Sequence, residues 1–168
     1  MRGHLLALAI LLATLVAAPV AMAGDDIPLI KDLRNEARQC EDKRLPLLVL
    51  FSSNHCVYCM RIEEDFLKPM QNGGFYDDKV IIRRVELGNG NIRDFDGSTI
   101  DASALAERYD VSVTPTLVFI DARGRQLTQK LVGLTTPELY GGYLDQAIDT
   151  SLDRLRRTTP LAVHTPHQ

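Results

Sequence analysis

Residues 47–59 read LLVLFSSNHCVYC, and this stretch decides how the surrounding chain folds. It opens with five consecutive apolar residues, 47–51, which predict a strand buried on both faces at the centre of a parallel or mixed sheet. A polar turn follows, and Cys56 opens the next segment. The residues that recur at helical spacing from there on are Cys59, Ile62, Phe66 and Met70. The stretch therefore predicts a buried strand, a short turn and a helix whose N-terminus lies at Cys56.

The predicted position of Cys56 at a helix N-terminus makes it a candidate nucleophile. Free N–H groups and the positive end of the helix dipole stabilise a thiolate there. Thiols in such positions have lowered pKa values, and the thiolate is the reactive form. Cys59 lies one turn deeper, on the face that packs against the sheet, where it can resolve a mixed disulfide formed by Cys56. The pair therefore predicts thiol-disulfide exchange.

The C-x-x-C spacing also occurs in zinc sites, and this alternative stays open in the sequence. Structural zinc normally takes a second pair of Cys or His ligands. Cys40 and His55 are the candidates, although Cys40 lies in a different predicted element. Covalent haem requires His directly after the second Cys, where this chain has Met60. We therefore expect no metal ligands and no cofactor, and the alternative to an enzyme is a copper-chaperone-type module that uses the same Cys pair.

The third cysteine, Cys40, falls on the apolar stripe of a predicted helix, residues 29–43. The other members of the stripe are Ile30, Leu33 and Ala37. A buried free Cys behaves as a small hydrophobe, which is the role predicted here. The alternative is a regulatory or intermolecular disulfide, because an odd number of cysteines in an exported protein leaves one thiol unpaired.

The first 23 residues predict a secretory signal peptide. Arg2 precedes an apolar run, residues 5–18, and Ala21-Met22-Ala23 supplies the small-x-small pattern that signal peptidase recognises. The alternative is an uncleaved anchor, since a spanning helix needs roughly 20 apolar residues. We expect cleavage after Ala23, a periplasmic location and no stable membrane insertion of the mature chain.

Removal of residues 1–23 would leave one domain of ordinary size, residues 24–157, and a tail, 158–168, that we expect to be disordered. The full chain carries 19 Lys and Arg residues against 22 Asp and Glu residues, a net charge of −3. A mildly acidic chain lacks the basic surface that nucleic acid or an anionic membrane attracts. Neither partner is expected.

The rest of the chain alternates apolar runs with amphipathic segments, a pattern typical of an α/β domain. In chain order the predicted elements are helix 29–43, strand 47–51, helix 56–70 ended or kinked by Pro69, strand 80–87, loop 88–99, helix 101–109, strand 117–120, turn 121–125, strand 126–132 and helix 136–157. A βαβ half followed by a ββα half on one sheet is the natural arrangement of this order.

A second motif, Thr114-Pro115, directly precedes the predicted strand 117–120. Pro115 cannot donate to a sheet ladder. A cis bond would turn Thr114 toward the Cys pair, where its backbone can pair with an extended substrate segment. An ordinary trans bond at a strand start is the alternative, because cis bonds are a minority even before proline.

Together, Cys56–Cys59 after an apolar strand, Thr114-Pro115 before another, and glycines at 124 and 133 resemble the thioredoxin superfamily over about residues 29–157. The C-x-Y-C site and the D-F-D-G loop, 94–97, are similar to those of periplasmic thioredoxin-like proteins related to SoxW. The resemblance implies a thioredoxin fold of the α/β class, with a central mixed sheet of about four strands flanked by helices. It implies a nucleophilic Cys56, a resolving Cys59 and a cis Pro115.

The resemblance also implies a function and partners. It implies a reductase of protein disulfides, kept reduced by a membrane electron carrier of the DsbD or CcdA kind. Thr before the cis proline is shared with disulfide isomerases of the superfamily, so isomerase activity stays an alternative. The physiological substrate and the redox potential are not encoded in any motif of the chain.

The chain departs from thioredoxins proper around the Cys pair. It has His55 where they have Trp, and Val-Tyr between the cysteines where they have Gly-Pro. Their buried acid, six residues ahead of the first Cys, is Leu50 here. The usual proton acceptor for Cys59 is therefore missing, unless Glu63, Glu64 or a water replaces it.

Two further residues complete the predicted substrate-binding set of Thr114, Pro115, His55 and Tyr58. His55 either stabilises the Cys56 thiolate, being partly protonated near neutrality, or faces solvent. Tyr58 either lines the substrate groove or covers the edge of the helix, since its ring and hydroxyl suit both settings.

Overall fold

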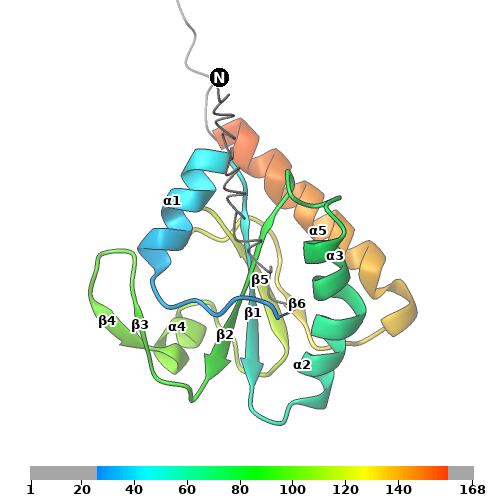
Figure 1. Ribbon diagram of the computed structural model, residues 1–168, viewed down its shortest axis with the longest axis horizontal. Helices are drawn as coiled ribbons and strands as arrows, with labels where there is room; N and C mark the ends of the chain where they lie inside the picture. The colour runs from blue at the N-terminus through cyan, green and yellow to red at the C-terminus, as the bar shows by residue number, and fades with distance from the viewer. Residues whose placement is uncertain (1–25, 159–168) are drawn as a thin grey trace, which may run out of the picture.

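A four-stranded sheet forms the centre of residues 26–158, the part of the chain that the computed structural model describes (Figure 1). Its strands are β1 (Leu47–Ser53), β2 (Ile81–Leu87), β5 (Thr116–Ile120) and β6 (Leu131–Val132). They lie in the order β2-β1-β5-β6, with β1 parallel to β2 and antiparallel to β5, and with β6 antiparallel to β5. The predicted mixed sheet of about four strands is confirmed.

Helices cover both faces of the sheet (Figure 1). On one face lie α1 (Leu33–Lys43) and α4 (Ala102–Arg108); on the other lie α2 (Val57–Ile62), α3 (Lys68–Asn72) and α5 (Pro137–Thr158). Alternate residues of β1 belong to the two cores: Val49 and Phe51 face α1 and α4, whereas Leu48 and Leu50 face α2 and α5. Burial on both faces explains why the β1 sequence is apolar without interruption.

The first helix begins four residues later than the predicted position 29. Residues 28–32 are instead extended beside β2, where the Arg84 N–H donates to the Pro28 carbonyl (2.9 Å) and the Ile30 N–H donates to the Arg84 carbonyl (2.9 Å). Asp32 then caps α1 by accepting a hydrogen bond from the Arg34 N–H at 2.9 Å. Pairing with a sheet edge thus overrides the helical spacing of the apolar residues.

The helix that follows Cys56 continues through Pro69 to Asn72 rather than ending at the proline. Between α2 and α3 it widens into a π-helical segment, η1 (Glu63–Leu67). A proline removes one N–H and its ring crowds the carbonyl four residues earlier. The π turn directly before Pro69 changes the hydrogen-bond spacing there, and the helix continues past the proline into α3.

Two predictions about the second half of the chain are wrong. The predicted loop 88–99 contains a hairpin of two short strands, β3 (Asn91–Arg93) and β4 (Thr99–Asp101), held by the buried Ile92. The predicted strand 126–132 is reduced to β6 and an isolated bridge between Gln126 and Ile120. Both segments are short and polar, so their strand character depends on neighbours distant in sequence.

The predicted signal peptide, residues 1–23, and the tail beyond Thr158 lie outside the described residues. Within residues 26–158, no helix has both the length and the apolar character needed to cross a bilayer.

Candidate active site

The turn between β1 and α2 places Cys56 at the start of the helix, as the sequence predicts. The Cys56 N–H donates to the Ser53 carbonyl (3.2 Å), and Cys56 is the N-cap residue of α2. His55, between them, has a φ of +61°, in the left-handed region that non-glycine residues rarely occupy but in which His is enriched. This conformation turns the chain sharply from the strand into the helix.

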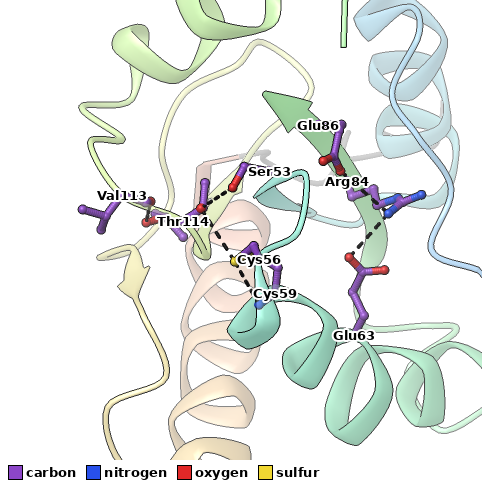
Figure 2. The surroundings of a disulfide bond; sticks show 9 residues. Ser53, Cys56, Cys59, Glu63, Arg84, Glu86, Val113 and Thr114 are labelled. Atoms are coloured by element: carbon purple, nitrogen blue, oxygen red, sulfur yellow. Dashed lines mark hydrogen bonds and ion pairs between the residues drawn. A yellow bond between two sulfur atoms is a disulfide. The ribbon is translucent and has the colours of Figure 1, made fainter. Parts of the chain in front are cut away.

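Cys56 and Cys59 form a disulfide at this helix N-terminus (Figure 2). The Cys56 sulfur accepts a hydrogen bond from the Cys59 N–H at 3.2 Å, so a free helix donor is directed at the sulfur. Cys56 is half-buried, whereas Cys59 is 1% exposed. An attacking sulfur from outside can therefore reach the disulfide only at Cys56.

Thr114 approaches the same sulfur from the loop that precedes β5, the strand next to β1 (Figure 2). The Thr114–Pro115 peptide bond is cis, and the Thr114 hydroxyl donates to Cys56 Sγ at 3.8 Å. The Ser53 hydroxyl lies 2.8 Å from the Thr114 hydroxyl. The structure thus brings together Cys56, Cys59 and Thr114, which the sequence predicts, and adds Ser53, which it does not.

The residues around Cys56 form an exposed rim with an apolar character. The exposed apolar side chains of this rim are Val57, Tyr58, Met60 and Val113. Tyr58, which is 59% exposed, is available to a substrate instead of being packed against the helix. His55 is exposed, and among the hydrogen bonds of residues 26–158 none joins its imidazole to Cys56.

The family model for thioredoxin-like domains matches residues 33–148, which span the whole site. The chain belongs to this thioredoxin-like family. Membership of the family, together with the Cys56–Cys59 pair at a helix N-terminus, makes the protein a thiol:disulfide oxidoreductase.

Solved structures of other proteins are similar to this thioredoxin-like chain. A DsbH oxidoreductase superposes with a TM-score of 0.53 at 20% identity, covering 79% of this chain and 90% of its own. A thioredoxin from Fasciola hepatica gives a TM-score of 0.48 at 18% identity (73% and 97% covered). A thioredoxin-fold protein from Helicobacter pylori gives 0.46 at 20% identity (67% and 78% covered). A comparison with curated protein sequences gives no match.

A buried acidic residue lies one helical turn from Cys59 in this thioredoxin-like domain, on the helix rather than on β1. Leu50, at the position of the acid in thioredoxins proper, is fully buried. Glu63 lies one helical turn beyond Cys59, and the Glu63 N–H donates to the Cys59 carbonyl. Glu63 is 7% exposed. Its carboxylate lies 3.6 Å from the Arg84 guanidinium (Figure 2). Burial raises the pKa of Glu63, and the nearby Arg84 partly opposes this shift.

Glu64, the other predicted acceptor, has a different environment. Its side chain is exposed and pairs with Lys68 at 2.6 Å on the helix surface. Of the two carboxylates, only Glu63 faces the protein interior. Arg83 and Arg84 lie next to each other in β2, which also contains Glu86. Two adjacent arginines in a partly buried strand are the sequence signal that acidic partners lie nearby, because buried charges are paired.

Cys40 lies apart from the active-site pair, in the core between α1 and the sheet. It is a free thiol, 3% exposed, and burial raises its pKa to about 12. In the part of the chain that the structure describes, no group of three or more His, Cys, Asp or Glu side chains is arranged to hold a metal ion.

Proposed function

We propose that the protein is an exported reductase of protein disulfides, in which Cys56 attacks and Cys59 resolves. The observation that carries this proposal is the difference in accessibility between the two sulfurs, with half-buried Cys56 at the helix N-terminus and Cys59 fully buried. The half-buried thiol of Cys56 is the one that a substrate disulfide can reach, and the helix N-terminus stabilises its thiolate.

The reaction proceeds by two exchanges of sulfur bonds. The Cys56 thiolate attacks a substrate disulfide, which forms a mixed disulfide and releases one substrate thiolate. Cys59, after losing its proton, attacks Cys56 Sγ, and the electron pair of the broken bond leaves on the second substrate sulfur. The substrate gains two electrons, and the enzyme is left with the Cys56–Cys59 disulfide.

Glu63 takes the role of proton acceptor for Cys59 in this proposal. Its burial and its position one turn from Cys59 support the assignment, and its raised pKa makes it a stronger base than an exposed carboxylate. Glu64 is excluded because it is exposed and paired with Lys68.

Substrate binding in this proposal uses the Thr114–Pro115 turn and the exposed rim. The backbone of Thr114, next to Cys56, pairs with an extended substrate segment. Tyr58 and Val113 offer apolar contact on either side, and His55 lines the same opening. The substrates are therefore unfolded or flexible protein segments that present a disulfide.

A reductase needs a source of electrons, because each turnover leaves its own cysteines oxidised. The signal-like residues 1–23 favour export to the periplasm, and the resemblance to SoxW-related proteins favours a membrane electron donor of the DsbD or CcdA kind. The proposed reductase is therefore exported to the periplasm and receives its electrons from such a donor.

Insulin reduction with dithiothreitol as electron donor tests the proposal. Cys56→Ser should abolish turnover, Cys59→Ser should accumulate a mixed disulfide visible on a non-reducing gel, and the control Cys40→Ala should retain full activity. Full activity of Cys56→Ser would overturn the assignment. The equilibrium of the Cys pair with glutathione gives its reduction potential and hence the direction of electron flow. A reductase should have a potential near that of thioredoxin, about −270 mV, whereas an oxidant should have a potential of about −120 mV. Refolding of a scrambled disulfide protein would reveal isomerase activity.

A further inference from the structure

Ser53 is the last residue of β1, and Thr114 lies two residues before the first residue of β5, the strand that neighbours β1. Phe51 and Thr116 are the last pair of β1 and β5 at this end, and Ser53 and Thr114, each two residues outside that pair, lie close together. Ser and Thr in such positions form side-chain hydrogen bonds, and their hydroxyls are 2.8 Å apart. The register therefore brings a second hydroxyl to the active site.

The number of protons on the two hydroxyls determines the direction of the hydrogen bonds. A Thr hydroxyl has one proton to donate. When Thr114 donates it to Cys56 Sγ, at 3.8 Å, the hydrogen bond between Ser53 and Thr114 must have Ser53 as its donor. The result is a directed chain from the Ser53 hydroxyl through the Thr114 hydroxyl to the Cys56 sulfur.

Such a chain has its largest effect when Cys56 is a thiolate. A charged acceptor strengthens a hydrogen bond, and a donor behind the bond polarises it further. Ser53 also holds the Thr114 hydroxyl in one orientation, and Thr114 is the only side-chain partner of Ser53 among the hydrogen bonds of residues 26–158.

We propose that Ser53 is a positioning residue for thiol-disulfide exchange, which orients the Thr114 hydroxyl so that it donates to the Cys56 thiolate. The inference rests on the proposed role of Cys56 as the nucleophile. Because Ser53 stabilises the thiolate, it favours the reduced form of the enzyme and makes its reduction potential less negative. Nothing in the C-x-x-C motif itself records this contribution.

The experiment measures how fast iodoacetamide alkylates Cys56 as a function of pH in the full reduced protein, with the Cys56 peptide followed by mass spectrometry. Ser53→Ala should lower the acid dissociation constant of Cys56 about twofold to threefold, because it removes only the polarising donor. Thr114→Val should lower it about tenfold, because it removes the bond to the thiolate itself. The double variant should match Thr114→Val, since Ser53 acts only through Thr114.

Matched variants separate this role from a structural one. Ser53→Thr keeps the hydroxyl and should restore the wild-type value. Ser103→Ala makes the same chemical change at an exposed position on α4 and should leave the value unchanged. The equilibrium constant with glutathione should shift by the same factor as the dissociation constant in each variant, and an unchanged circular dichroism spectrum verifies the fold.

An unchanged Cys56 dissociation constant in Ser53→Ala would overturn the inference, as would additive effects of Ser53→Ala and Thr114→Val. These outcomes are distinct from failure of the proposed function, which is read from the insulin activity of Cys56→Ser. If the protein reduces insulin but Ser53→Ala leaves the Cys56 dissociation constant unchanged, the role of Ser53 is disproved and the proposed function stands.

Discussion

The buried thiol of Cys40 gives a prediction with a magnitude that follows from the structure. Burial raises its pKa from the ordinary value of 9.0 to about 12, and the side chain is 3% exposed. At pH 8 an ordinary thiol is roughly 10% ionised and one with a pKa of 12 roughly 0.01%, so ionisation alone slows alkylation about 1000-fold. Cys40 should therefore be inert in the folded protein.

The assay counts alkylated cysteines by mass spectrometry after reduction and treatment with iodoacetamide at pH 8. The folded wild-type protein should carry one adduct, on Cys56, because Cys59 and Cys40 are both buried, and the protein unfolded in guanidinium chloride should carry three. Cys40→Ala should carry one adduct when folded and two when unfolded. Alkylation of Cys40 in the folded protein within tenfold of the Cys56 rate would refute the reasoning, and a disulfide-linked dimer absent from Cys40→Ala would establish the intermolecular role instead.

Two further predictions concern stability, measured by urea unfolding. The pKa of Glu63 is raised in the folded protein, chiefly by burial. Its protonated form therefore contributes to the free energy of unfolding at low pH, and this contribution is lost as the pH rises through the folded pKa. Glu63→Gln keeps a polar partner for Arg84 and should remove this pH dependence of the free energy of unfolding above pH 4.5. Identical pH profiles of wild type and Glu63→Gln would contradict the raised pKa of Glu63. Gly124→Ala should cost about 1–2 kcal/mol from its φ of +74° alone, and more because the added Cβ would lie 2.7 Å from Phe95. Gly88→Ala, with a φ of +81° and no atom within 4 Å, should show only the conformational part; equal losses would rule out the contact with Phe95.

Those elements that the sequence predicts well are those with a strong local signal. The apolar runs 47–51 and 117–120 appear as β1 and β5, because both of their faces are covered by helices. The helix N-terminus at Cys56 is equally local, since a strand, a four-residue turn and a helical stripe follow one another without interruption. In each case the pattern of burial is written in adjacent residues.

The elements that the sequence misses depend on partners elsewhere in the chain. Strands β3 and β4 have three residues each, and Ile92 is the one residue of them that is buried. A segment rich in Gly, Asn and Asp with one apolar residue is read as a loop by any local rule. Residues 28–32 follow a helical spacing but pair with Arg84, more than fifty residues away.

The same distinction applies within the active site. The Cys pair and the Thr114–Pro115 motif are recognised from adjacent residues, and so they can be predicted. Ser53 gains its partner 61 residues away, and the significance of Glu63 is visible only once Arg84 lies beside it. A polar residue in a turn and an acid on a helix are too common to be assigned a role without the contact that the fold supplies.

The register of β1 and β5 is therefore the feature on which the site depends. Five cross-strand pairs, from Leu47 with Ile120 to Phe51 with Thr116, fix where the two strands end relative to each other. A slip of one residue would exchange the side chains of β5 between the two cores, so that each would meet the packing partners of the other face. Because the core fixes the register, the Thr114 turn is held against the Cys56 sulfur without any side chain of the rim having to hold it there. The residues at the opening can consequently differ from those of thioredoxins proper, as His55 and Tyr58 do, while the geometry of exchange at the sulfur is retained.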